Sequence, residues 1–118
     1  MRTILAAAIV CFSLSVEAQV QIPSANHILP DCKKVIDRPR KPAPEDAFHQ
    51  GICIGIVFAV HELNPLLPVY MRFCMPADAS LGQSIQVIVG YVDAQPERHH
   101  EQFITLALEG LQMEWPCK

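Results

Sequence analysis

The stretch GICIGI at residues 51–56 places one cysteine between two glycines inside an apolar run. Pro44 and the two acidic residues after it suit the first turn of a helix, and Pro65 limits the segment at its other end. We therefore predict a helix from Pro44 to about Leu63. Each glycine costs about 1 kcal/mol relative to alanine in a helix, so close packing is expected along their shared face. The run is apolar nearly all round, which predicts the central, most buried helix of a small bundle.

The first 18 residues have the pattern of a secretory signal peptide. Arg2 gives a basic start, an apolar stretch follows, and residues 16–18 read Val-Glu-Ala before a predicted cleavage site. Residues 19–118 then form the mature chain, which we expect to be a single helical domain. Cys11 lacks the small preceding residue that lipoprotein processing requires, so we expect it to leave with the signal peptide.

The charge of the mature chain excludes some classes of protein. Eight basic and eleven acidic residues remain after cleavage, which leaves a mildly acidic chain. Nucleic-acid binding requires a basic patch, and the one cationic cluster lies in the proline-rich loop around residues 38–41. The longest apolar segment, Ile52–Val60, is too short to span a bilayer. We therefore expect an exported domain with no nucleic-acid partner and no membrane span.

The cysteines of the mature chain predict disulfides. An even number of cysteines in a small exported chain is typical of a disulfide framework, and here three connectivities are possible. The spacings of 21, 21 and 43 residues contain no close pair of the kind that zinc sites use. A catalytic cysteine would need a base such as His49 or His61, and a free thiolate suits an oxidising compartment poorly. The four residues are Cys32, Cys53, Cys74 and Cys117.

Three further helices are predicted around the central one. Ser24–Ile36 forms a short helix that Pro30 weakens. Ser80–Gln83 matches a capping box and precedes an apolar stripe of helical spacing, although the β-branched residues in 85–92 leave a strand as the alternative. Pro96 starts the fourth helix. The predicted fold is therefore all-α, a small disulfide-tied bundle of about four helices.

The order of the helices indicates which cysteines meet. If the third and fourth helices form an antiparallel hairpin, the start of one and the end of the other lie at the same end. Cys74 precedes that start and Cys117 follows that end, so we predict a Cys74–Cys117 bridge and, from the remaining pair, Cys32–Cys53. The main alternative joins Cys53 to Cys74 and Cys32 to Cys117.

The order of several short motifs resembles the Rap/Tai family of type VI secretion immunity proteins, over roughly residues 24–117. The family pattern combines a Gly-x-Cys-x-Gly helix, a Phe-Cys-x-Pro turn, a glutamine near the next helix start, a Tyr-x-x-x-x-Pro junction and a terminal Phe-Pro-Cys. Trp115 replaces the more common phenylalanine. The matching residues here are Gly51–Gly55, Phe73–Pro76, Gly82-Gln83, Tyr91, Pro96 and Trp115–Cys117.

The resemblance implies a periplasmic, mostly helical protein that binds and blocks a peptidoglycan amidase or endopeptidase effector injected by another cell. The matched positions determine the fold and do not mark an inhibitory surface.

The inhibitory surface must be inferred from the residues themselves. Asn64–Phe73 joins two helices with two prolines and many apolar residues. Proline reduces the entropy lost on docking, and Tyr70 and Arg72 are of types common at binding hot spots, so we expect both to face a partner. The alternative is that the segment's apolar side chains cap the core.

Neither catalysis nor cofactor binding is predicted. His99-His100-Glu101 do not converge on one ion, since adjacent helical residues point about 100° apart, and no catalytic constellation or metal site is expected. The alternative function is that of a small periplasmic stress protein or acid chaperone, because five histidines would charge on acidification. The glycine-lined helix is compatible with a monomer or a homodimer.

Overall fold

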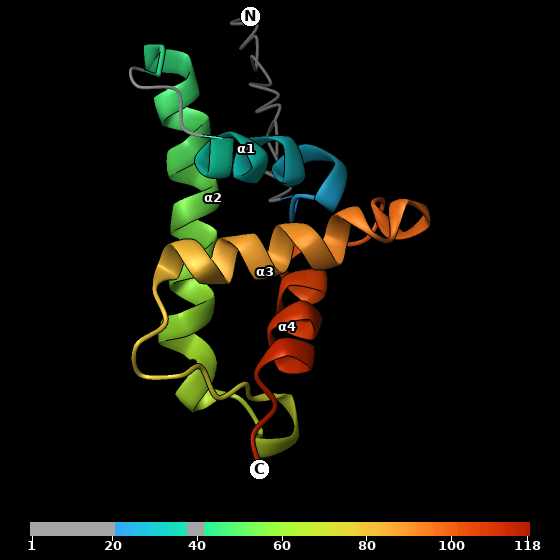
Figure 1. Ribbon diagram of the computed structural model, residues 1–118. Coiled ribbons are helices and arrows are strands. Elements are labelled where there is room, and N and C mark those ends of the chain that lie inside the picture. Colours follow the sequence, from blue (N-terminus) through green and yellow to red (C-terminus); the bar gives the residue numbers. More distant parts are fainter. Residues whose placement is uncertain (1–20, 38–41) are drawn as a thin grey trace, which may run out of the picture.

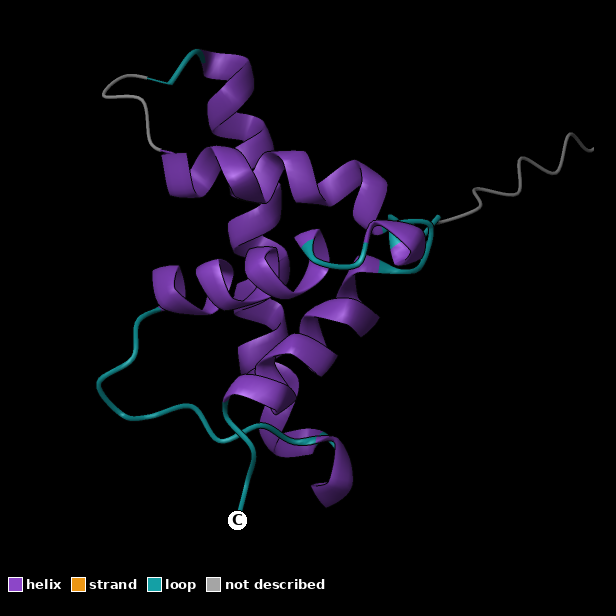
Figure 2. Ribbon diagram, turned by 45° about the vertical axis from the view of Figure 1, so that its right-hand side comes forward, coloured by secondary structure: helices purple, strands orange, loops and turns teal. Residues whose placement is uncertain are grey.

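The computed structural model describes residues 21–37 and 42–118, so the predicted signal peptide and the cationic cluster lie outside the described residues. The described parts are helical, which confirms the all-α prediction (Figure 2). Residues 85–92 lie within a helix, and the strand alternative is wrong. The α-helices are α1 (Ala25–Asp37), α2 (Pro44–Leu63), α3 (Leu81–Asp93) and α4 (Phe103–Glu114), with short 3₁₀ turns η1 (Asn64–Leu66), η2 (Val69–Met71) and η3 (Pro96–Arg98).

The four helices form two packed pairs around one core. α1 packs mainly on α2, and α3 packs mainly on α4, while α1 also contacts α3. Figure 1 shows α2 running along the length of the molecule, with α1 and α3 lying across it. The fully buried large side chains come mostly from α2, α3, α4 and the segment before α3, and α1 contributes Cys32. They include Val57, Phe73, Ile85, Ile88, Phe103, Leu106 and Leu111.

Two disulfides join the pairs of elements that the sequence predicted. Cys32 bonds to Cys53 between α1 and α2, and Cys74 bonds to Cys117 between the segment before α3 and the chain end. The predicted connectivity is confirmed, and the alternative pairing is wrong. Loop-closure entropy assigns such bridges roughly 3 to 4 kcal/mol each, a large share of the stability of a domain this small.

The capping box at the start of α3 is present as predicted. Ser80 N–H donates to Gln83 Oε1 at 2.6 Å, and Gln83 N–H donates to Ser80 Oγ at 3.2 Å. These bonds satisfy two backbone donors that the first turn of a helix leaves free.

The predicted start of the fourth helix is wrong. α4 begins at Phe103, and the chain from Pro96 first forms η3 and a turn. The reason is that this turn holds the beginning of α1: Ala25 N–H donates to Glu101 O at 2.9 Å, and Asn26 N–H donates to His99 O at 2.8 Å. These carbonyls satisfy free donors of the first turn of α1 and take no part in a continuous helix.

The predicted role of α2 also needs correction. α2 buries Cys53, Val57 and Val60 on one side only, and its opposite side is exposed. A Cβ atom added at Gly51 or Gly55 would meet nothing within 4 Å, so neither glycine lies in a close packing contact of this chain. A helix that is apolar nearly all round can therefore have one face in the core and the opposite face exposed to solvent.

Close packing at a glycine occurs instead at Gly110 in α4. A Cβ atom there would lie 2.9 Å from Cβ of Tyr91 in α3. We expect Gly110→Ala to lower the free energy of unfolding by about 1–3 kcal/mol, because the helices must move apart. Gly90→Ala in α3 is the matched control: its Cβ enters open space, and it should stabilise by up to about 1 kcal/mol. Equal denaturant midpoints for the two variants would contradict this account.

Candidate functional site

The connector, residues 64–73, leaves the end of α2 and returns to the core before α3. Pro65 and Pro68 prevent a continuous helix, and the chain forms the two short turns η1 and η2 instead. The connector exposes three large apolar side chains: Leu66 is 79%, Val69 75% and Tyr70 84% exposed. The end of α2, the connector and the chain end lie together at one end of the molecule (Figure 1).

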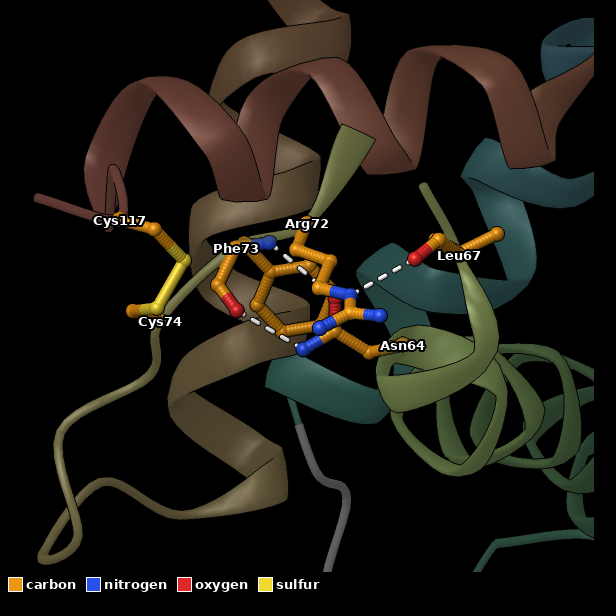
Figure 3. The surroundings of a disulfide bond; sticks show 6 residues. All are labelled: Asn64, Leu67, Arg72, Phe73, Cys74 and Cys117. Carbon is orange, nitrogen blue, oxygen red and sulfur yellow. Dashed lines mark hydrogen bonds between the residues drawn. A yellow bond between two sulfur atoms is a disulfide. The ribbon is translucent and has the colours of Figure 1, made fainter. Parts of the chain in front are cut away.

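Polar contacts hold the two ends of the connector together, as Figure 3 shows. The side chain of Asn64 donates to Phe73 O at 2.8 Å and accepts from Phe73 N–H at 3.1 Å. Arg72 Nε donates to Leu67 O at 2.7 Å. Phe73 itself is buried in the core. The exposed side chains therefore stand on a loop whose shape is fixed in advance, which reduces the entropy lost on binding.

A second set of contacts attaches the end of the connector to the chain end. Cys74 N–H donates to Trp115 O at 2.8 Å, and Phe73 forms an isolated bridge with Pro116. The Cys74–Cys117 disulfide adds a covalent link at the same place. The position of the connector thus depends on the last residues of the chain as well as on α2.

His61 lies where α2, α3 and the end of the connector meet. Its Nε2 is 2.9 Å from Oγ of the buried Ser84, and its ring meets that of Phe73 edge-on with centroids 5.0 Å apart. The Ser84 hydroxyl is also 3.3 Å from Met75 Sδ. Burial lowers the pKa of His61, and the charge of nearby Glu62 partly opposes this effect.

The lowered pKa of His61 predicts a loss of stability on mild acidification. The unfolded chain takes up this proton near pH 6.5, and the folded chain does so only at lower pH. The free energy of unfolding therefore falls as the pH drops below about 6.5, and this contribution levels off below the folded pKa. Thermal unfolding of the wild type and His61→Gln across this range measures the effect, since glutamine can bond to Ser84 without titrating. Parallel curves of Tm against pH would contradict the prediction.

The two predicted partner-binding residues, Tyr70 and Arg72, differ in their exposure to solvent. Tyr70 is the most exposed of the connector's apolar residues. Arg72 is half-buried, and its Nε bonds within the connector. The alternative that the apolar side chains cap the core holds for Phe73, which is buried, but not for Leu66 and Val69. That Tyr70 and Arg72 face a partner stays a prediction.

Sequence reasoning missed a second exposed apolar surface, on α2. Phe48, Ile54 and Phe58 are exposed on the same side of this helix as Gly51 and Gly55. Exposed apolar side chains that gather on one side of a helix are candidates for a contact with another protein. Large and small apolar residues recur at helical spacing in this stretch, and this pattern could have indicated the exposed face. The same pattern is equally typical of a buried helix.

A cluster of hydrogen-bonded polar side chains near the start of α4 stabilises the packing of the preceding turn against α3 and α4. The guanidinium group of Arg98 donates to Glu109 at 2.7 Å and to Glu101 at 2.8 Å, and Tyr91 also donates to Glu109 at 2.9 Å. The hydrogen bonds from Arg98 lower the pKa of both carboxyl groups. These contacts join the turn before α4 to the α3–α4 pair.

Within residues 21–37 and 42–118, no three acidic, histidine or cysteine side chains form a group that could hold a metal ion. All four cysteines of that part form disulfides, so none of them is a free nucleophile. His99 lies in the turn before α4, with Nε2 2.8 Å from Val92 O. None of the described helices combines the length and apolar character needed to cross a membrane.

Comparison with protein-family models gives a match over most of the chain. The model of the family described as Rap1a immunity proteins matches residues 24–117, which include all four helices and both disulfides. The match begins shortly after the predicted cleavage site. No curated protein and no solved structure gives a match.

Proposed function

Because this chain belongs to the family of Rap1a immunity proteins, we propose that it binds a peptidoglycan amidase or endopeptidase effector and blocks its catalytic cleft. Membership makes the chain an immunity protein and not an enzyme. The family implies a cognate effector as partner, and it supports the inhibitor over the acid-chaperone alternative. That this effector is a cell-wall hydrolase is the part of the proposal that goes beyond family membership.

The connector is the observation that carries the proposal. Leu66, Val69 and Tyr70 are exposed on a loop fixed by the Asn64–Phe73 pair of hydrogen bonds. An exposed, preformed apolar loop at the end of a molecule suits insertion into a concave site such as a hydrolase cleft. Inhibition by occlusion needs no chemistry from the inhibitor.

We place this function in the periplasm. Disulfides persist in oxidising compartments and are rare in the cytosol. The N-terminal pattern of residues 1–18 predicts export, and the family match starts at residue 24. In the periplasm the protein would meet an effector that acts on the cell wall.

A capture experiment tests the proposed function. Oxidised, tagged mature protein (residues 19–118) is incubated with periplasmic and secreted fractions of the source cells, and bound proteins are identified by mass spectrometry. We expect a peptidoglycan hydrolase in near-equal molar amount, and inhibition of that hydrolase at a one-to-one ratio on purified cell wall. Recovery of many unrelated proteins, or of a hydrolase that stays fully active, would contradict the proposal.

A second copy of the chain is the partner that we propose for the exposed face of α2. The open space beside Gly51 and Gly55 lets another helix approach closely, and Phe48 and Phe58 supply apolar area on the same face. A face that carries both large and very small residues can pack against its own copy about a two-fold axis.

Molar mass in solution tests this assembly. We expect the mature protein to have twice its monomer mass by sedimentation, and Phe58→Glu to give the monomer, because the charge would be buried at the contact. Met113→Glu is the control, since Met113 is also exposed but lies on α4. A wild type that stays monomeric at micromolar concentration would refute the assembly.

A further inference from the structure

We propose that the Cys74–Cys117 disulfide is a site of thiol–disulfide exchange with dithiol reductants in the folded protein, whereas the Cys32–Cys53 disulfide is not. The two bridges are chemically identical, so any difference in their reactivity arises from their surroundings. Access of a reductant to the sulfur atoms controls the rate of exchange.

The surroundings of the two bridges differ in accessibility. Cys74 is exposed and Cys117 is half-buried. Cys32 and Cys53 are both 0% exposed, between α1 and α2. A thiolate can therefore reach the first bridge without an opening of the fold, but the second becomes accessible only when α1 separates from α2.

The position of Cys74–Cys117 in the chain supports the same conclusion. Cys117 lies after the end of α4, and Cys74 lies in the irregular segment between the connector and α3. Figure 3 shows the bridge at the junction of this segment with the chain end. Only short, irregular segments need to move when an attacking thiol approaches.

The exchange conserves atoms and electrons. A thiolate of the dithiol attacks one sulfur of the Cys74–Cys117 bridge, forming a mixed disulfide and releasing the other cysteine as a thiolate, which takes up a proton. The second thiol of the reductant loses its proton and attacks the mixed disulfide, which releases the second cysteine. The dithiol is oxidised to its disulfide, and the protein gains two thiols. Attack by the pair of protein thiols on an oxidised dithiol reverses the step.

Reduction at this site removes one attachment of the connector while α1 and α2 stay linked. The Asn64–Phe73 hydrogen bonds and the Cys74–Trp115 backbone bond remain, so we expect the fold to persist and the connector to become more mobile. Weaker binding of the effector follows from this mobility, a consequence that rests on the proposed function.

Selective labelling tests the exchange site without any partner. Native mature protein is treated with dithiothreitol at neutral pH, quenched at intervals with iodoacetamide, and mapped by mass spectrometry. We expect Cys74 and Cys117 to be labelled on the order of tenfold faster or more than Cys32 and Cys53. Equal rates at all four positions, or faster labelling of Cys32 and Cys53, would overturn the proposal. In Cys74→Ser/Cys117→Ser, the remaining pair should still be labelled more slowly than Cys74 and Cys117 of the wild type, and labelling as fast as theirs would likewise overturn the proposal.

The selectively reduced protein is then alkylated and compared with the oxidised protein for binding to the captured hydrolase. We expect about a tenfold loss of affinity, because the connector must be ordered on binding. Unchanged affinity would overturn the role of the bridge in holding the connector, although selective labelling would still establish the exchange site. If neither form binds a hydrolase, the proposed function fails and the labelling result is unaffected.

Discussion

Removing the three exposed side chains of the connector abolishes most of the affinity for the hydrolase. In Leu66→Ser/Val69→Ser/Tyr70→Ala we expect the dissociation constant to rise by about a hundredfold or more, because a few exposed anchor residues usually supply most of the binding energy. The side chains make little contact with the core, so Tm should change little. Titration calorimetry with the captured hydrolase measures the loss, and thermal unfolding checks the fold.

Met113→Ala is the control for this variant. Met113 is 72% exposed, comparable to the connector residues, but it lies on α4. Its loss should leave affinity within about twofold of the wild type, as expected for an exposed residue outside an interface. A triple variant that binds as tightly as Met113→Ala would refute the connector as the inhibitory surface.

Single substitutions separate the roles of Tyr70 and Arg72. Tyr70→Ala should lower affinity without a change in stability, because the ring is exposed. Arg72→Ala removes the Nε bond to Leu67 O, so it can lower affinity by loosening the connector even if its guanidinium group never touches the partner. Faster amide exchange of Leu67 in the free Arg72→Ala protein would reveal this indirect effect.

Removing the buried disulfide has the largest expected effect on stability. We expect Cys32→Ala/Cys53→Ala to lower the free energy of unfolding by about 3–5 kcal/mol, since both loop-closure entropy and packing between α1 and α2 are lost. The total free energy of unfolding of such domains is about 5–15 kcal/mol, so the variant should be only marginally stable. Denaturant unfolding followed by circular dichroism measures the loss.

Cys74→Ser/Cys117→Ser separates the packing and entropy effects. It opens a longer loop, with a sequence separation of 43 against 21, but removes little buried volume. Its stability loss should therefore reflect loop closure alone, about 4 kcal/mol at most. A Cys32→Ala/Cys53→Ala protein that loses less than about 1 kcal/mol would show that the α1–α2 contact does not need its bridge.

Local signals in the sequence predicted the elements of this fold well. The capping box at Ser80 and Gln83 fixed the start of α3, and Pro44 and Pro65 bounded α2. The predicted pairing of all four cysteines is correct, with Cys74 before the start of α3 and Cys117 after the end of α4. The start of α4 was missed because a long-range contact decides it: residues 99–101 bond to the beginning of α1 instead of extending a helix.

The surfaces were harder to predict than the core. Apolar periodicity does not distinguish a helix face in the core from an exposed apolar face. The sequence therefore predicts a buried helix, whereas Phe48 and Phe58 are exposed. The connector was identified from its prolines and Tyr70, but the hydrogen bonds of Asn64 and Arg72 that shape it join residues whose pairing no sequence rule specifies. The contact of His61 with Ser84 likewise depends on the packing of α2 against α3.

Amide hydrogen exchange of the intact protein, free and bound to the captured hydrolase, tests the central claim most directly. If the connector enters the catalytic cleft, amides within residues 64–73 should exchange markedly more slowly in the complex, since a buried interface excludes water. Unchanged exchange in residues 64–73, together with protection confined to α3 and α4, would contradict occlusion by the connector.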